Sequence, residues 1–330
     1  MMSIVIPLYN NLESAQRLLR SVYKQFDRSR GEVIVVDDGS TGCDTSVLEG
    51  EFSGLKIIRL EKNAGASNAR NIGARNAAYD IILFLDADME LCGGAIDEAE
   101  RSMAEKGTDA VVGTITDTPL NRGIFQDYWA ILKSYFQSLP RERSSTFYPM
   151  VGAIRKEVFD AVGGFDARIK GASIEDYEIS MRIDAAGYKV RYNPGMIGHT
   201  SYKGFLTTLL QSCGRAKKWA MIFLGRLKFD NHTTTASQGL GNLLGFLTLL
   251  LLAFSAVFRF LLPVAAAVLL GLVYVNRGFF MYVIRRRGPL FFVVSVLFYL
   301  VFSLFITLGS LSAFPYIFRS EKSRREVLYG

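Results

Sequence analysis

Three β-rich segments near the N-terminus are each followed directly by polar side chains of the kinds that bind cations and phosphates. These are Tyr9 and Asn10 after residues 3–7, Asp37 and Asp38 after residues 32–36, and Asp86 and Asp88 after residues 80–85. Carboxylates that lie close together repel one another unless a cation or a hydrogen-bonding ligand is bound among them. Asp86 and Asp88 bracket a single residue, so both can offer hard oxygen ligands to Mn²⁺ or Mg²⁺ beside a diphosphate.

The motifs of the commonest nucleotide sites do not accompany these side chains. The sequence has neither GxGxxG nor GxxxxGK[ST], so it lacks the phosphate-binding loops of dinucleotide-binding and P-loop proteins. Its three cysteines, Cys43, Cys92 and Cys213, are widely separated. They predict neither a disulfide framework nor a CxxC metal pair.

The elements that must position the polar residues alternate between strand and helix over the first two hundred residues. Strands are predicted at 3–7, 32–36, 56–60 and 80–85, and helices at 14–25 and 67–78. The DIILFL run at 80–85 is almost continuously apolar, as in a strand that is buried on both faces of a parallel sheet. The alternation predicts an α/β domain with a largely parallel sheet, in which ligands bind beyond the carboxyl ends of the strands.

The charge differs in sign between the two parts of the chain. Residues 1–199 hold 23 Lys+Arg and 28 Asp+Glu, whereas residues 200–330 hold 15 and 3. A nucleic-acid-binding protein with a uniformly basic surface would not be acidic over its first two hundred residues, so we expect no nucleic-acid partner. The basic part is also the apolar part, which is typical of a segment that contacts a membrane.

Three apolar runs in the second part predict membrane spans. Residues 239–258 and 288–318 contain no charged side chain, and residues 260–284 contain only Arg277. About 20 helical residues cover the ~30 Å hydrocarbon core of a bilayer. The first two runs would form a hairpin with Arg259 at its outer turn. The basic stretch 285–287 then marks a cytoplasmic loop by the positive-inside rule.

The third run leaves two alternatives open. If it spans, the basic residues of 319–325 lie outside, against the positive-inside rule; if it is re-entrant, Gly309 and Pro315 permit the break. No secretory signal is expected before the first strand, so the N-terminal domain is expected in the cytoplasm. Residues 205–229 carry five basic side chains among apolar ones, which predicts amphipathic helices on an anionic leaflet, with an ordinary solvated helix as the alternative.

The first two hundred residues resemble the family 2 glycosyltransferases of the GT-A fold. The resemblance is carried, in the family's order and spacing, by IVIPLYN (4–10), VIVVDDGST (33–41), EKNAGASNARNIGARNA (61–77), ILFLDADME (82–90), GAIRKEVFDAVGGFD (152–166) and SIEDYEISMRIDAAGYKVRYNP (173–194). NRGFFMYVIRRRGPLFF (276–292) looks like the membrane tail of bacterial members. The resemblance implies a Rossmann-like, largely parallel α/β catalytic domain followed by two or three transmembrane helices.

The resemblance also implies a role for each matching residue in binding the donor. Pro7, Tyr9 and Asn10 would line the nucleotide pocket. Asp38 would accept a hydrogen bond from the base, and Asp37 would support that turn. Two further residues complete the donor site: Arg70 would reach the base or the diphosphate, and Asp86 would lie beside the ribose and the metal. A solvated helix charge is the alternative for Arg70.

The metal and the acceptor would be bound by a second set of residues. By the same resemblance, Asp88 is the direct ligand of Mn²⁺ or Mg²⁺, and His199 matches a further metal ligand of some members. Asp176 would be the catalytic base, with Glu175 orienting the acceptor. The alternatives are an acidic first turn of a helix for Asp176 and a packing role for His199. Trp129, in the aromatic region 114–150, would face the acceptor, although a core helix explains these aromatics about as well.

The implied activity is inverting, metal-dependent transfer of one sugar from a nucleotide-sugar, a UDP-sugar in many members. The acceptor would be a hydroxyl of a membrane-linked molecule, a polyprenyl-diphosphate glycan or a glycolipid, in cell-envelope glycan synthesis. Single addition is expected because Gln211, Arg215 and Trp219 are spaced four apart, unlike the Q-x-x-R-W of processive members. A polyprenyl-monophosphate sugar synthase and a non-catalytic membrane scaffold are the alternatives.

The predicted organisation has four parts. A catalytic domain covers 1–203, basic amphipathic helices cover 204–236, transmembrane helices cover 237–318 and a basic tail covers 319–330. We therefore expect a multi-pass protein of the inner, cytoplasmic membrane with its catalytic domain in the cytoplasm.

Overall fold

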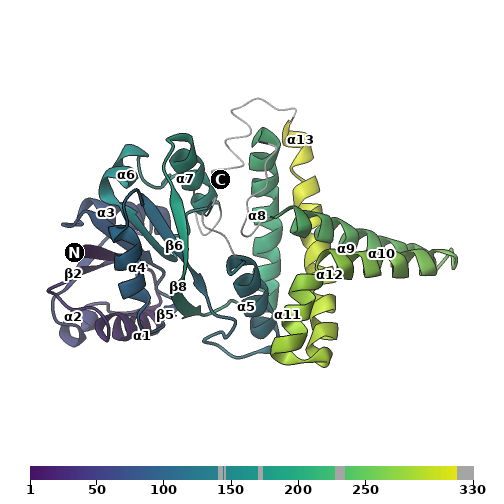
Figure 1. Ribbon diagram of the computed structural model, residues 1–330, viewed down its shortest axis with the longest axis horizontal. Helices are drawn as coiled ribbons and strands as arrows, with labels where there is room; N and C mark the ends of the chain where they lie inside the picture. The colour runs from purple at the N-terminus through teal and green to yellow at the C-terminus, as the bar shows by residue number, and fades with distance from the viewer. Residues whose placement is uncertain (140–143, 145, 170–173, 227–234, 318–330) are drawn as a thin grey trace. The chain divides into compact units, whose positions relative to one another are not determined.

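The computed structural model describes residues 1–139, 144, 146–169, 174–226 and 235–317, and it divides them between two units. The first unit contains Met1–Leu120 and Ser138–Ser201, and the second contains Asn121–Gln137 together with the described residues from Tyr202 onward. The expected boundary at residue 203 stays a prediction. The structure adds that the aromatic segment 121–137, which interrupts the first unit in sequence, belongs to the second (Figure 1).

An eight-stranded sheet forms the centre of the first unit, with the strand order β3-β2-β1-β4-β7-β6-β8-β5 (Figure 1). The strands are β1 (Met2–Leu8), β2 (Gly31–Asp37), β3 (Leu55–Arg59), β4 (Ile81–Leu85), β5 (Met89–Leu91), β6 (Ala110–Ile115), β7 (Val151–Arg155) and β8 (Val190–Thr200). The four strands predicted from the sequence are β1 to β4, and they pair in parallel. The strands β5 and β7 run antiparallel to their neighbours.

Helices cover this sheet and connect its strands. They are α1 (Leu12–Tyr23), α2 (Val47–Glu51), α3 (Ala66–Arg75), α4 (Ala95–Ala104), α6 (Lys156–Ala161) and α7 (Glu175–Ala185). One core cluster joins Val5, Val36 and Phe84 of the sheet to Ala69 of α3 and Ile179 of α7. Because β4 is apolar on both faces, as DIILFL predicts, its side chains are buried on either side.

The register of the parallel strands brings their carboxyl ends to one edge. Leu8 pairs with Asp37 across β1 and β2, and β4 pairs with the other side of β1. The segments that follow these three strands therefore emerge side by side. This is the edge at which the polar clusters were expected.

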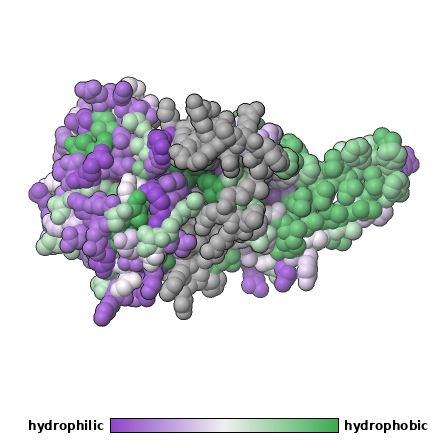
Figure 2. Space-filling model, turned by 90° about the horizontal axis from the view of Figure 1, so that it is seen from above, coloured by the Kyte–Doolittle hydropathy of each residue, from purple (hydrophilic) through white to green (hydrophobic). Residues whose placement is uncertain are grey.

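The second unit is helical. Its helices are α5 (Ile124–Gln137), α8 (Phe205–Arg226), α9 (Ala236–Ser255), α10 (Leu261–Val275), α11 (Arg277–Arg287), α12 (Pro289–Leu311) and α13 (Phe314–Ile317). Two stretches, Ala236–Ser255 and Pro289–Tyr316, are long and apolar enough to cross a membrane by length and composition. The predicted hairpin of the first two runs is present as α9 and α10, and the face of it seen in Figure 2 is mostly apolar.

A sharp helix bend lies within the second predicted apolar run, at a position that the sequence analysis did not single out. The chain bends by 77° between α10 and α11, at Asn276, whereas α12 continues through Gly309 to Leu311. Asn276 is buried, and its side-chain amide donates to the carbonyl of Leu272 at 3.1 Å. Gly309 is held close to α8, because a Cβ there would lie 2.3 Å from the carbonyl oxygen of Cys213. Gly309 therefore serves close helix packing and not a break.

Gly73 tests the packing of α3 on β1. A Cβ at Gly73 would lie 2.3 Å from Cγ1 of Val5, so Gly73→Ala should lower the free energy of unfolding by about 1–3 kcal/mol through overpacking. Gly50→Ala in α2 is the matched control, because nothing lies within 4 Å of its Cβ position. Because Ala is a better helix former than Gly, this control should leave the free energy of unfolding unchanged or raise it by up to about 1 kcal/mol. Equal melting temperatures of the two variants would contradict this packing.

Candidate active site

The segment after β1 shapes the loop that follows β2. Asn10 has a φ of 50°, in the left-handed region that Asn tolerates better than most residues. Its Oδ1 accepts from the backbone N–H groups of Thr41 at 2.9 Å and Gly42 at 3.0 Å. Its own N–H donates to Oγ of Ser40 at 2.9 Å. Asn10 thus fixes a loop, and the neighbouring Tyr9 ring is 48% exposed and can contact a ligand.

Asp37 and Asp38 both use their carboxylates within the protein. Asp37 accepts from the N–H of Ser40 at 2.9 Å and from the hydroxyl of Thr45 at 2.6 Å. These bonds fix the turn that follows β2, and the role of Asp37 in supporting a nucleotide site stays a prediction. Asp38 is 2% exposed, and its two oxygens each accept a backbone N–H at 2.8 Å, from Ala64 and Gly65. The expected contact of Asp38 with a base stays a prediction, and the structure adds that Asp38 holds the segment before α3. Pro7, at the end of β1, is half-buried.

Arg70 and Asp86 form the central ion pair of the site. Nη2 of Arg70 lies 2.5 Å from Oδ1 of Asp86, and the arginine side chain is 5% exposed against 33% for the aspartate. Nε and Nη1 of Arg70 are buried and have no hydrogen-bond partner among the residues that the structure describes. A solvated helix charge is therefore excluded for Arg70. Buried guanidinium N–H groups without acceptors are costly, which favours a ligand that supplies oxygen atoms beside Asp86.

Sequence reasoning missed two residues that position Arg70. The Phe165 ring lies against the guanidinium, with Cζ of Arg70 5.5 Å from the ring centroid. Asn71 fixes the Phe165 backbone at both groups: its Nδ2 donates to the carbonyl at 2.7 Å, and its Oδ1 accepts from the N–H at 2.8 Å. Both residues lie within motifs that carry the resemblance, which was the available signal. The next residue, Asp166, has a pKa held below its usual value, chiefly by a hydrogen bond from Arg168.

Asp88 and His199 lie on neighbouring chain segments at the edge of the sheet. The carbonyl of Asp88 accepts the N–H of Ser201 at 3.1 Å, and His199 pairs with Glu90 across β5 and β8. Nδ1 of His199 lies 3.0 Å from the carbonyl oxygen of Thr118. Nδ1 also lies 2.7 Å from Oγ1 of Thr116, so both contacts use Nδ1 and leave Nε2 as the nitrogen that can bind a metal.

The acidic pair Glu175 and Asp176 begins α7, and Glu175 is buried. One carboxylate oxygen of Asp176 accepts the N–H of Tyr177 at 2.9 Å, and its carbonyl accepts the hydroxyl of Ser180. That hydroxyl also accepts the N–H of Phe147 at 2.8 Å. Through Ser180, Asp176 is therefore connected to residues 147–150. The same segment contacts the acidic turn, because the N–H of Asp86 donates to the carbonyl of Met150 at 3.3 Å.

Trp129 lies in the second unit, on α5. Its ring packs on Phe302 of α12 at 4.7 Å between centroids and on Phe125 at 5.9 Å, and Nζ of Lys133 lies 5.4 Å from it. These contacts agree with the helix-packing alternative. Contact with an acceptor stays a prediction.

The acidic turn suits a divalent cation that also binds phosphate. Among the described residues, no three His, Cys, Asp or Glu side chains are grouped closely enough to hold a metal by themselves. Mg²⁺ and Mn²⁺ commonly bind one or two carboxylates and complete their coordination with water and substrate phosphates. The turn 86–88 supplies such carboxylates, and the buried N–H groups of Arg70 beside it suit a phosphate. The donor set therefore fits a metal that arrives with its substrate.

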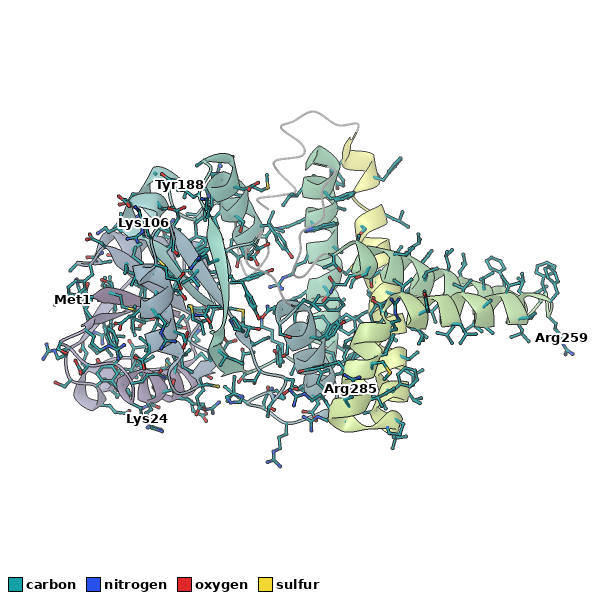
Figure 3. All side chains as sticks on the ribbon, viewed as in Figure 1. Met1, Lys24, Lys106, Tyr188, Arg259 and Arg285 are labelled. Carbon is teal, nitrogen blue, oxygen red and sulfur yellow. The ribbon has the colours of Figure 1, made fainter. Side chains whose placement is uncertain are left out.

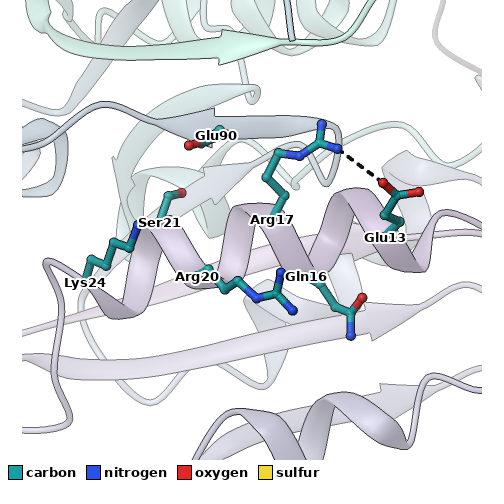
Figure 4. A pocket seen from close by; sticks show the side chains of 7 residues that line it. All are labelled: Glu13, Gln16, Arg17, Arg20, Ser21, Lys24 and Glu90. Carbon is teal, nitrogen blue, oxygen red and sulfur yellow. Dashed lines mark hydrogen bonds and ion pairs between the residues drawn. The ribbon is translucent and has the colours of Figure 1, made fainter. Parts of the chain in front are cut away.

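A small pocket of about 190 Å³ lies between α1 and β5 (Figure 4). Its lining is polar and of mixed charge: Glu13, Gln16, Arg17, Arg20, Ser21, Lys24 and Glu90. Two of its arginines pair with carboxylates, Arg17 with Glu13 at 3.4 Å and Arg20 with Glu51 at 2.8 Å. None of the predicted site residues lines this pocket.

The comparisons with known proteins are consistent with this arrangement. Residues 3–174 match the family described as "Glycosyl transferase family 2". An uncharacterized glycosyltransferase of Haemophilus influenzae is 31% identical over 193 residues, 56% of this chain and 62% of that protein. The glycosyltransferase AglE of Haloferax volcanii is 26% identical over 201 residues, 59% of this chain and 65% of that protein. The match thus spans under two thirds of each relative.

Two solved structures share the fold. The mannosyltransferase PcManGT of Pyrobaculum calidifontis, solved with GDP-Man and Mn²⁺, has a TM-score of 0.57 at 15% identity, covering 95% of this chain and 86% of that one. GalNAc-T7, solved with UDP, GalNAc and Mn²⁺, has a TM-score of 0.50 at 20% identity, covering 62% of this chain and 44% of that one. At these identities the likeness concerns the fold alone. It confirms the α/β, GT-A-like fold expected from the sequence.

Asp38 offers a test of how the site is held together. Asp38→Ala removes the acceptor of two backbone N–H groups, so it should lower the free energy of unfolding by about 1–3 kcal/mol and speed amide exchange at Ala64 and Gly65. Asp44→Ala is the control, because Asp44 is exposed and accepts the N–H of Ser46 in its own turn. Its effect should stay within about 0.5 kcal/mol. Equal exchange rates in the two variants would contradict the structural role of Asp38.

Proposed function

We propose a reaction on the premise that this chain is a glycosyltransferase that belongs to glycosyl transferase family 2. The proposed reaction is the transfer of a single sugar from a nucleotide-sugar, with inversion, to a hydroxyl group of a membrane-linked acceptor. The observation that carries the proposal is the ion pair of the buried Arg70 with Asp86. Two other guanidinium nitrogens of Arg70 have no partner among the described residues, and they lie beside the acidic turn at the carboxyl edge of the sheet.

The donor would bind along this edge. Tyr9 offers an exposed ring to the base, and Asn10 fixes the loop beside it. Arg70 would donate its unused N–H groups to diphosphate oxygens, while Phe165 and Asn71 hold its guanidinium in place. The nucleotide-sugars and Mn²⁺ with which GalNAc-T7 and PcManGT were solved support a donor of this class.

Asp88, with Asp86 beside it and His199 as a further candidate, would hold Mn²⁺ or Mg²⁺. When bound, the metal would neutralise the negative charge that develops on the departing nucleoside diphosphate. Asp86 is held by Arg70, so its second oxygen faces a fixed direction and need not reorganise during the reaction.

Asp176 would act as the general base. It would take the proton of the acceptor hydroxyl as the oxygen attacks the anomeric carbon, from the face opposite the leaving diphosphate, and this gives inversion. Asp176 lies in the first turn of α7, where the partial positive charge of a helix N-terminus interacts favourably with a carboxylate. Glu175, the preceding residue, is buried and would help to orient the acceptor.

The acceptor is proposed from the second unit. A transferase of soluble sugars has no need for apolar helices long enough to cross a bilayer. Attachment would hold the site near the headgroups and so raise the effective concentration of a lipid-linked acceptor, a polyprenyl-diphosphate glycan or a glycolipid. The location proposed is the inner membrane, with the catalytic domain in the cytoplasm, in cell-envelope glycan synthesis.

Asp176→Asn tests the base. Without a carboxylate to take the proton, turnover should fall about 10²–10⁴-fold, while the dissociation constant of the donor stays unchanged. The measurement supplies each common nucleotide-sugar with Mn²⁺ and a bacterial lipid extract, and follows label entering the organic phase. Asp184→Asn, exposed on the same helix, is the control and should retain full turnover. Full activity of Asp176→Asn on an acid-labile product would point to a phosphate acceptor, as in a polyprenyl-monophosphate sugar synthase.

Asp88→Ala tests the metal. In the unchanged protein, Mn²⁺ should tighten the binding of UDP or GDP in calorimetry, and a chelator should reverse the gain. The variant should lose most of this metal-dependent gain, because a principal ligand of the metal is gone. Asp97→Ala, in an exposed part of α4, should keep it. Absence of nucleotide binding under every condition would favour a membrane scaffold over an enzyme.

A further inference from the structure

The two long apolar stretches of the second unit run in different directions. The α9–α10 hairpin crosses α12 and projects away from it, whereas α8 lies along α12 (Figure 1). The normal of a flat bilayer can follow the hairpin or α12, but it cannot follow both. Length and composition alone allow either stretch to span. What packs around each one decides between them.

The middle of α12 is covered by helices that carry charges. Phe298 packs on Tyr128 of α5 at 5.0 Å between ring centroids, and Phe302 packs on Phe125 at 5.8 Å. Phe205, the first residue of α8, lies 5.6 Å from Phe298. These contacts join the centre of α12 to the start of α8 and to α5, and both of these follow directly on segments of the first unit.

A spanning α12 would carry these charges into the bilayer. Its centre would place two charged residues near the hydrocarbon midplane: Lys133, whose Nζ lies by the Trp129 ring that packs on Phe302, and Lys203, two residues before Phe205. Further along, Gly309 lies against Cys213 of α8, and Lys217 lies 4.4 Å from the Tyr316 ring. The two helices therefore run in the same direction. Charged side chains at that depth are expensive, so α12 is unsuited to cross.

The hairpin has the opposite surroundings. Beyond its contact with α12, large apolar side chains are exposed on both of its helices: Leu250, Leu252 and Phe254 on α9, and Leu262, Val264 and Leu270 on α10. From Gly241, where it packs on α12, to its end at Ser255, α9 extends about 22 Å of the ~30 Å hydrocarbon core. The 15 residues of α10 extend about 22 Å, and Arg259 at the tip can reach the far headgroups with its long side chain (Figure 3).

Polar groups gather at the base of the hairpin, where it meets α12. Ser303 donates to Oδ1 of Asn242 at 3.3 Å, and the Tyr299 hydroxyl donates to Oδ1 of Asn276 at 3.4 Å. Gly241 and Gly245 of α9 permit the close approach, since a Cβ at either would meet these side chains within 2.5 Å. Polar groups at this level suit the boundary between hydrocarbon and headgroups.

We propose that only the α9–α10 hairpin, among the described helices, crosses the bilayer, and that α12 lies in the plane of the membrane surface. The proposal rests on the proposed attachment to a membrane. The exposed apolar stripe of α12 (Leu290, Val293, Leu297, Leu308 and Leu311) would then face the acyl chains. Both ends of the chain lie on one face of the membrane, so the basic stretches 285–287 and 319–325 are on the same side, as the positive-inside rule requires.

Cysteine labelling of the full chain in membranes tests this topology. In a background with Cys43, Cys92 and Cys213 changed to Ser, single reporters are placed in the catalytic domain (Lys106→Cys), at the hairpin tip (Val257→Cys) and in the tail (Ser323→Cys). A membrane-impermeant maleimide should label the domain and tail reporters only in inside-out vesicles, and the tip reporter only in right-side-out ones. Lys106 is exposed and marks the cytoplasmic face.

Each other labelling outcome overturns the proposal. A tail reporter labelled from the same side as the tip would show that α12 spans. A tip reporter that is protected from both sides, or labelled from the cytoplasmic side, would show that the hairpin does not cross. Recovery of the chain in the soluble fraction would overturn the membrane attachment itself, which is a distinct result.

The depth of α12 gives a second measurement. Nitroxides at Leu290, Leu297 and Leu308 should show equal ratios of collision with oxygen and with a water-soluble nickel complex, because a helix in the membrane plane has one depth along its length. A ratio that peaks at Leu297 and falls towards both ends is the result for a spanning helix, and it would overturn the proposal.

Discussion

The parallel register of β1 with β2 and β4 is the constraint on which the site depends. Hydrogen bonding between these strands ends at the same level, so the segments after Leu8, Asp37 and Leu85 emerge at one edge. Acidic side chains that are far apart in sequence are thereby brought together. The Arg70–Asp86 pair offsets part of the resulting repulsion, and α3 can deliver Arg70 there because it packs on β1.

The acidic residues at this edge divide between building the loops and meeting a ligand. Asp37, Asp38 and Asn10 use their oxygens on backbone N–H groups and hydroxyls of the loops that surround the site. A charged acceptor for two N–H groups is among the strongest ways to fix a loop. The side chains of this first set therefore fix the loops around the site. The proposed chemistry is assigned to a second set of carboxylates, those of Asp86, Asp88 and Asp176.

The second unit shows how an insertion can join a catalytic domain to apolar helices. The α5 segment lies between β6 and β7 in sequence, yet its aromatic face packs on α12 and its Asp127 pairs with Arg287 of α11 at 3.4 Å. Within the described residues, the chain therefore passes between the two units at Leu120–Asn121 and at Gln137–Ser138, in addition to Ser201–Tyr202. Such contacts make it costly to separate α12 from the segments that continue into the first unit.

The sequence by itself determined the strands β1 to β4, the family and the polar clusters after the strands, because apolar runs and short motifs are local signals. It also predicted the helical hairpin, because a charge-free run of about 20 residues has the length and composition of a membrane-spanning helix. Only the tertiary structure decided that Asp38 binds the 64–65 backbone, that Phe165 and Asn71 position Arg70, and that α5 belongs with α12. These depend on which distant segments touch, and side-chain contacts between distant segments leave no periodic trace in the chain.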